Sequence, residues 1–136
     1  MAEVAIRCGA DGLIVGNTSS KRAPDLTLSA EGAPIGAKEA GGLSGEPIRE
    51  HSLAAIRGMY EATRGKIPIV GCGGISTGEH AYAAIRAGAS LLQLYTAMVY
   101  HGPSVVTTIQ EDLAALLERD GYSSVAEAVG ADHISK

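Results

Sequence analysis

The sequence has 136 residues, of which 46% are hydrophobic and 19% charged, so it is long enough for one domain and too apolar for a disordered chain. A net charge of −4 argues against a general nucleic-acid-binding surface, and two cysteines are too few for a disulfide framework. No apolar run approaches the roughly 20 residues of a transmembrane helix.

In chain order, the hydrophobic pattern predicts helices that alternate with three short apolar strands. The strands are expected at Gly12–Gly16, Ile67–Cys72 and Leu91–Tyr95. The helices are expected over Ala2–Cys8, from Pro47 to an end at Gly65, from a capping box at Ser76 to about Ala87, from Val105 to about Gly121, and from a second capping box at Ser124. A long connection runs from Ser19 to Gly45, and connections of this length are typical of functional loops.

This alternation is typical of parallel strands joined by right-handed crossovers. The chain opens with a helix that would normally follow an earlier strand, and three strands cannot close a barrel. A complete (β/α)₈ barrel needs eight strands and about 250 residues. We therefore expect the C-terminal part of such a barrel, with three βα units present and about five missing. The alternative is a small free-standing α/β domain.

Polar residues and glycines collect where the predicted strands end. Asn17–Thr18, Gly73–Gly74 and Tyr95–Thr96 follow the three strands, and Gly41–Gly45 precedes the helix at Pro47. Parallel α/β folds bind ligands at the carboxyl ends of their strands, so these segments predict one site. Glycine turns before helices offer bare N–H groups and the positive end of a helix dipole, which suits a phosphate. A tight turn at Gly73–Gly74 and a strand-to-loop cap at Asn17–Thr18 remain open as structural alternatives.

The other chemistry-bearing residues are interpreted as structural or solvated. Cys72 is expected to be a small buried hydrophobe. The histidines have no metal-ligand spacing, so no metal site is predicted, and they are expected to be surface or capping residues: His51, His80, His101 and His133. The charged residues expected to be solvated are Lys21, Arg22, Glu111, Asp112, Glu118, Arg119 and Asp120.

Four motifs resemble, in order and in spacing, those of the dihydroorotate dehydrogenase family in its quinone-dependent class 2. They are Gly12–Thr18, Gly41–Arg49, Pro68–Ile75 and Gly88–Ala97, and the tail from His101 to His133 is similar too. The resemblance implies an FMN-containing (β/α)₈ barrel that oxidises dihydroorotate to orotate in pyrimidine biosynthesis and passes electrons to a quinone. The contacts with FMN that it implies come from Gly16, Ser44, Gly45, Gly73, Gly74, Tyr95 and Thr96. The contacts with dihydroorotate come from Asn17 and Thr18.

Residues 1–136 are therefore expected to form a partial FMN-binding barrel domain from which the family's N-terminal half is absent. In the family, that half carries the serine that acts as catalytic base, a lysine near the flavin, further asparagines for the substrate, and the helices of the quinone site. We expect no catalytic residue in this chain and no turnover by the chain alone. Membrane association is expected only through the absent half, at the mitochondrial inner membrane in a eukaryote or at the cytoplasmic membrane in a bacterium.

One residue departs from the family's pattern, because Gly16 stands where a threonine or serine that contacts FMN is usual. The loss of that hydroxyl is expected to weaken flavin binding by about 1 kcal/mol. Two other functions stay open. Another FMN- or phosphate-binding barrel enzyme would need different polar groups in place of Asn17–Thr18. A non-catalytic remnant would fold only with a partner chain, since a three-stranded sheet leaves edges and apolar side chains exposed.

Overall fold

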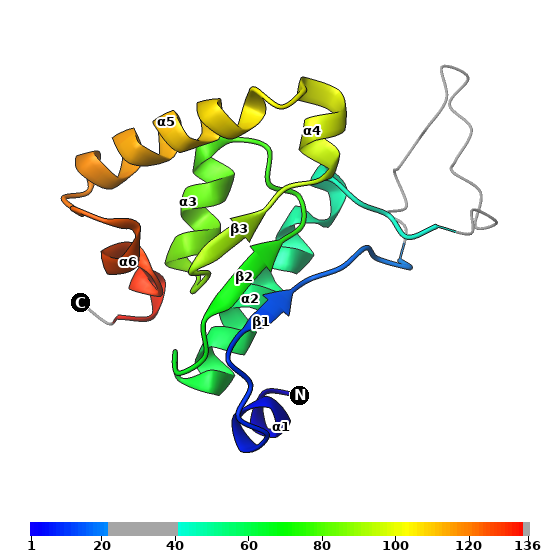
Figure 1. Cartoon of the computed structure of the whole chain (residues 1–136), viewed down its shortest axis with the longest axis vertical. Helices are drawn as coiled ribbons and strands as arrows, with labels where there is room; N and C mark the ends of the chain where they lie inside the picture. Colours follow the sequence, from blue (N-terminus) through cyan, green and yellow to red (C-terminus); the bar gives the residue numbers. More distant parts are fainter. Residues whose placement is uncertain (22–40, 135–136) are drawn as a thin grey trace.

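The computed structural model describes residues 1–21 and 41–134. Its centre is a parallel sheet in the order β1–β2–β3, formed by Leu13–Val15, Ile69–Cys72 and Leu91–Gln93 (Figure 1). The parallel order agrees with the alternation of helices and strands in the sequence. The middle of the connection predicted from Ser19 to Gly45, residues 22–40, lies outside the described residues.

Helices pack against one face of this sheet and against each other. The α-helices are α1 (Ala2–Arg7), α2 (Arg49–Thr63), α3 (Gly78–Arg86), α4 (Thr96–His101), α5 (Val105–Arg119) and α6 (Val125–Ala128), and two 3₁₀ turns are η1 (Glu46–Ile48) and η2 (Ala131–His133). Helix α2 packs on β1 and β2, and α3 packs between β3 and α5. Figure 1 shows α5 crossing one end of the molecule, above α3. The core therefore lies between the sheet and helices α2, α3 and α5.

The two faces of the sheet have different surroundings. On the helix-covered face, Ile69 is fully buried and Val15 is buried beside Ile56 of α2. On the other face, Ile14 and Leu91 are both in register with Val70, yet they are 64% and 65% exposed. Apolar side chains at both edges of a parallel sheet are thus left open to solvent, which is unusual because such sheets are normally covered on both faces.

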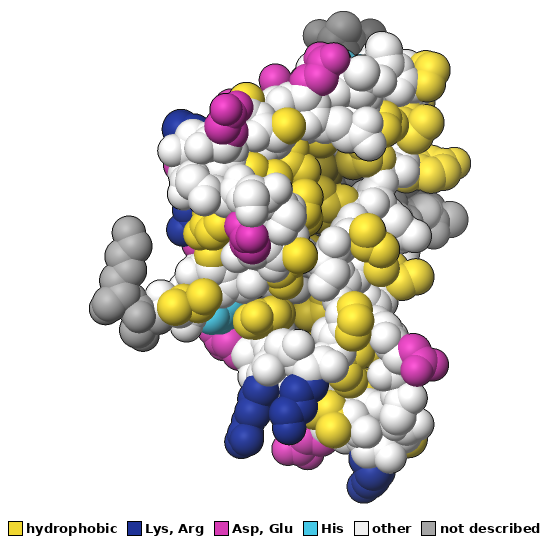
Figure 2. Space-filling view, turned by 60° about the vertical axis from the view of Figure 1, so that its left-hand side comes forward, with side chains coloured by type: hydrophobic (Ala, Val, Ile, Leu, Met, Phe, Trp, Pro, Cys, Tyr) yellow, Lys and Arg dark blue, Asp and Glu magenta, His cyan; other side chains and the backbone are white. Residues whose placement is uncertain are grey.

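Further apolar side chains are exposed around α4. Tyr95, Val99 and Tyr100 are 81%, 72% and 80% exposed. In the orientation of Figure 2, hydrophobic side chains also gather in a hollow on the surface of the molecule. The described residues therefore do not enclose all of their apolar surface.

Among the described residues, no helix is both long and apolar enough to cross a membrane.

Of the two helix starts predicted from capping boxes, the first is displaced by one residue and the second is at the predicted residue, Ser124. Helix α3 is capped by Thr77 instead of Ser76, because Thr77 is extended and its hydroxyl accepts a hydrogen bond from the amide of His80 at 3.2 Å. Ser124 caps α6 as predicted but makes no side-chain cap bond, and the Glu127 carboxylate accepts hydrogen bonds from the amide and hydroxyl of Ser123 at 2.8 and 2.7 Å. These bonds from Ser123 lower the pKa of Glu127.

The third strand is shorter than predicted, because a helix begins where the apolar run continues. Strand β3 ends at Gln93, and Tyr95 already precedes the first residue of α4. Helix α4 was not predicted. It has six residues, its first turn has no side-chain cap, and only Ala97 in it is buried, so it has no amphipathic pattern to recognise. The other predicted helices and strands are present, with bounds within a few residues.

Candidate functional site

The carboxyl ends of the three strands open on one hollow of about 770 Å³, called here the carboxyl-edge pocket. All nine residues predicted for the site line it: Gly16, Asn17, Thr18, Ser44, Gly45, Gly73, Gly74, Tyr95 and Thr96. The chain thus brings together segments that are far apart in the sequence. The lining also includes residues that were not predicted for the site, among them Gln93, Ser76, Tyr100 and His101.

The segment after β1 forms one wall of the pocket. The side-chain oxygen of Asn17 accepts a hydrogen bond from the amide of Thr18 at 2.7 Å, which fixes the orientation of the Asn17 amide group. The next residue, Ser19, pairs with Leu43 in an isolated antiparallel bridge through backbone hydrogen bonds of 2.9 and 2.8 Å. This bridge holds the Asn17–Thr18 wall against the segment that precedes η1.

The second wall joins the start of η1 to the start of α4. The hydroxyl of Thr96 donates a hydrogen bond to the hydroxyl of Ser44 at 3.0 Å. Gly45 has a φ of 78°, and a Cβ on it would lie 3.0 Å from the methyl group of Thr96. Glycine is therefore required at this position both by conformation and by the close approach of Thr96.

The turn after β2 lies directly on the first turn of α2. Gly73 and Gly74 have φ values of 119° and 74°, and a Cβ on either would overlap this turn, at Ser52 and at the backbone of Arg49 respectively. The interpretation as a tight turn is therefore correct for this pair. It does not compete with a binding role, because the same packing places the pair beside the start of η1 and α2, where the helix dipole is positive.

The lining combines apolar side chains with glycines and a few uncharged polar groups, and it carries few charges. Among the described residues that line the pocket, Glu46 is the one carboxylate, and neither a lysine nor an arginine occurs. An anion in this pocket would therefore be held by backbone N–H groups, by hydroxyl groups and by the Asn17 amide. Cys72, which was predicted to be buried, is half-buried and lines the pocket beside Gln93, its partner in register.

In residues 1–21 and 41–134, no group of three or more side chains could hold a metal ion. Lys21 is exposed, as predicted for a solvated charge, whereas Arg22 lies outside the described residues.

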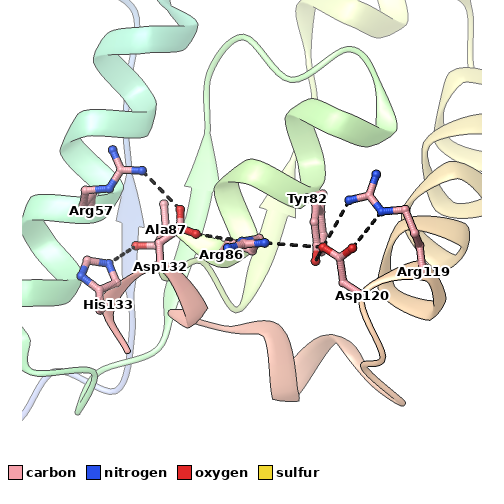
Figure 3. A network of polar contacts seen from close by, with 8 residues as sticks. All are labelled: Arg57, Tyr82, Arg86, Ala87, Arg119, Asp120, Asp132 and His133. Carbon is pink, nitrogen blue, oxygen red and sulfur yellow. Dashed lines mark hydrogen bonds and ion pairs between the residues drawn. The ribbon is translucent and has the colours of Figure 1, made fainter. Parts of the chain in front are cut away.

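A polar network lies at the amino-terminal edge of the sheet, away from the pocket (Figure 3). Asp120 is exposed, as predicted for a solvated charge, but its carboxylate also accepts hydrogen bonds from Tyr82 at 2.6 Å and from Arg119 at 2.8 Å. The hydrogen bonds from Arg119 and then from Tyr82 lower the pKa of Asp120 from 3.8 to about 2. Arg86 also lies 3.5 Å from this carboxylate.

The C-terminal tail is held by the other half of this network. Asp132 accepts hydrogen bonds from Arg86 at 2.8 Å and from Arg57 at 3.4 Å. His133 was predicted to be a surface or capping residue, but its side chain is only 16% exposed. Its ring lies 2.9 Å from the carbonyl oxygen of Ala87 and packs against Tyr60, with the ring centroids 4.8 Å apart. These contacts join residues 46 or more positions apart, so no local sequence pattern predicts them.

Comparison with known proteins places this geometry in context. Residues 1–117 match the family model described as dihydroorotate dehydrogenase. The chain is 51% identical over 133 residues to the mitochondrial dihydroorotate dehydrogenase (quinone) of Arabidopsis thaliana, and 51% identical over 132 residues to dihydroorotate dehydrogenase (quinone) of Azorhizobium caulinodans. These alignments cover 98% and 97% of this chain but 28% and 35% of the two relatives.

Solved structures show the same relationship. The chain is similar to the ligand-free crystal structure of DHODH from Eimeria tenella, with a TM-score of 0.86 and 40% sequence identity. The alignment covers 98% of this chain and 36% of that one. The chain thus spans about a third of the length of the proteins it matches. The fold class predicted from the sequence, an incomplete (β/α)₈ barrel, is confirmed by this likeness.

Proposed function

Because the chain belongs to the dihydroorotate dehydrogenase family, we propose that it forms the C-terminal part of an FMN-dependent enzyme that oxidises dihydroorotate to orotate with a quinone as acceptor. The observation that carries this proposal is the carboxyl-edge pocket. Nine residues from the four motifs that resemble the family line one hollow at the edge of the sheet where parallel α/β folds bind ligands.

The pocket fits the phosphate of FMN by its chemistry. Gly45 and Gly74 allow their segments to pack against Thr96 and Arg49, at the start of η1 and α2, where backbone N–H groups can bind an anion. Ser44 and Thr96 add hydroxyl groups, and Tyr95 precedes the first turn of α4. We assign these residues, together with Gly16 and Gly73, to the flavin. When bound, FMN would accept two electrons from dihydroorotate and pass them on to the quinone.

Asn17 and Thr18 are assigned to dihydroorotate. The Asn17 amide offers donors and an acceptor, and Thr18 offers a hydroxyl, which together suit the imide and carboxylate groups of the substrate. We assign no residue of this chain to the catalytic base, which the resemblance implies is a serine from the rest of the barrel. The chain alone is therefore expected to be inactive. We place membrane association, at the mitochondrial inner membrane or the bacterial cytoplasmic membrane, outside residues 1–136.

One observation also favours a second candidate function. The open face of the sheet, with Ile14 and Leu91 exposed, would suit a non-catalytic unit that folds only when a partner chain supplies further strands. The first proposal predicts that the native protein contains a flavin and oxidises dihydroorotate, and the second predicts neither.

The test uses the native protein, captured from its source with an antibody against this chain. We expect captured protein that contains FMN and oxidises dihydroorotate when a quinone is supplied. The flavin is measured by its fluorescence after denaturation, and orotate by its absorbance. Captured protein that carries no flavin and oxidises no dihydroorotate would contradict the proposed function and favour the second candidate.

A further inference from the structure

We propose that Gly42 is a positioning residue, whose missing side chain sets the place of the Thr18 hydroxyl in the carboxyl-edge pocket. The inference rests on the proposed function in one respect, since it treats Thr18 as a contact of dihydroorotate. The structural claim, that the position of Thr18 depends on the absence of a side chain at position 42, rests on the geometry of the two segments alone.

The contact between the two residues leaves no room for a methyl group. A Cβ built on Gly42 would overlap both the hydroxyl oxygen and the Cβ atom of Thr18, and would lie 3.4 Å from the carbonyl carbon of Thr18. Gly42 is not among the described residues with a positive φ, so its backbone would accept an alanine. Space, and not backbone conformation, therefore demands glycine at this position.

Rotation of the Thr18 side chain cannot relieve this overlap, because rotation about χ1 does not move the Cβ atom. The backbone of one segment must shift instead. The next residues along each segment, Ser19 and Leu43, are joined by two backbone hydrogen bonds of 2.9 and 2.8 Å. A side chain at position 42 would therefore strain or open this bridge and carry the Thr18 hydroxyl away from its position in the pocket.

The neighbouring residues provide matched controls. Among the described residues, none lies within 4 Å of a Cβ built on Gly41, so Gly41→Ala makes the same chemical change one residue away without a collision with any of them. Gly58 lies within α2, away from the pocket, and a Cβ there would also have nothing within 4 Å. Neither residue has a positive φ. Gly41→Ala is the control for the exchange measured at the Ser19–Leu43 bridge, and Gly58→Ala is the control for the affinity of the ligand.

The experiment uses the native, full-length protein with two readouts, which are hydrogen exchange at Ser19 and Leu43, measured by mass spectrometry, and the affinity for orotate. In Gly42→Ala we expect faster exchange at both amides, and orotate binding about tenfold weaker, as for the loss of one hydrogen bond to a ligand. Gly41→Ala should leave the exchange unchanged, and Gly58→Ala should leave the orotate affinity unchanged.

A second background separates this coupling from a general loss of structure. In Thr18→Gly the colliding Cβ atom is gone, so the further change Gly42→Ala should add nothing to exchange or to affinity. Unchanged exchange in Gly42→Ala, or additive effects of the two substitutions, would overturn the inference. If the unmodified full-length protein binds no orotate, the proposed role of Thr18 fails, while the exchange rates still decide whether Gly42 positions it.

Discussion

The hydroxyl of Thr96 donates a hydrogen bond to the hydroxyl of Ser44 at 3.0 Å, across a separation of 52 residues in the chain. This contact fixes the start of η1 beside the start of α4, two places where backbone N–H groups have no partner within the helix. Gly45 packs against the same threonine. The wall that we assign to the flavin phosphate is therefore held together by the side chains of the site itself.

Gly16 gives the first prediction. A Cβ on Gly16 would lie 3.2 Å from the carbonyl oxygen of Cys72, so a side chain fits there after a shift of a few tenths of an ångström. Gly16→Ser should tighten the binding of FMN by about 1 kcal/mol, the net value of one hydrogen bond. Calorimetric titration with FMN measures this change. Gly16→Ala is the control for the added methylene group, and equal affinity in the two variants would contradict a hydroxyl contact.

Asp120 predicts a dependence of stability on pH. Its pKa is about 2 in the folded chain against an ordinary 3.8, so the unfolded chain binds the proton more readily. The stabilisation is complete above about pH 5 and is lost as the pH falls from about 5 to about 2. Asp120→Asn should therefore lower the melting temperature at pH 6 but change it little near pH 2.

Tyr82→Phe removes the 2.6 Å hydrogen bond to the same carboxylate, so it should bring the pKa of Asp120 in the folded chain closer to its ordinary value. Stability should then be lost over a narrower range of pH. The control is Glu111→Gln, which alters an exposed carboxylate on α5. Thermal melts followed by circular dichroism measure each variant. A deficit in Asp120→Asn that is equally large at pH 6 and pH 2 would contradict the account of this network.

Tyr60 predicts an unequal cost for two similar glycine substitutions. Gly130 and Gly121 have φ values of 73° and 82°, so alanine is strained at both. A Cβ on Gly130 would overlap the Tyr60 ring, whereas one on Gly121 would have no described residue within 4 Å. Gly121→Ala should cost about 1 kcal/mol from backbone strain, and Gly130→Ala about 3 kcal/mol because overpacking is added.

Urea unfolding of the two glycine variants gives both free energies. Equal destabilisation would mean that Tyr60 moves freely and that the tail is not packed as described.

The open face of the sheet predicts a contrast between two isoleucines. Ile69 is fully buried and Ile14 is 64% exposed. Ile69→Ala should cost about 2–5 kcal/mol, as for large-to-small changes in a core, and Ile14→Ala less than about 1 kcal/mol. The chain alone should also self-associate through this face, and sedimentation measures that. A monomer with a sharp melting transition independent of concentration would contradict an exposed apolar face.

The sequence was most informative where the signal was local. Short apolar runs bounded by glycine predicted the three strands, and the rule that parallel strands share a carboxyl edge brought Asn17, Gly74 and Thr96 to one place. The family resemblance then supplied chemical roles for these residues that periodicity could not. The error near Ser76 has a local cause, because two adjacent hydroxyl residues, Ser76 and Thr77, compete for the cap and only the backbone decides between them.

What the sequence could not show depends on contacts between distant segments. The hydrogen bonds of Asp120 and His133 could not be predicted because their partners, Tyr82 and Ala87, lie 38 and 46 positions away. Gly42 was recognised as part of a glycine cluster, but the lack of room for a side chain beside Thr18 follows only from the bridge between two segments. Helix α4 was missed because six residues with a single buried side chain carry no periodic signal.

The central claim is that the carboxyl-edge pocket holds the phosphate of FMN. The most direct test titrates the chain with FMN and with riboflavin, which lacks the phosphate, and follows the backbone-amide resonances. The account predicts that FMN shifts the amides of Gly45, Gly74 and Thr96 while riboflavin leaves them unchanged. It also predicts that Thr96→Val weakens FMN about tenfold, whereas Thr108→Val on α5 does not. Shifts confined to other residues, or equal shifts with riboflavin, would contradict it.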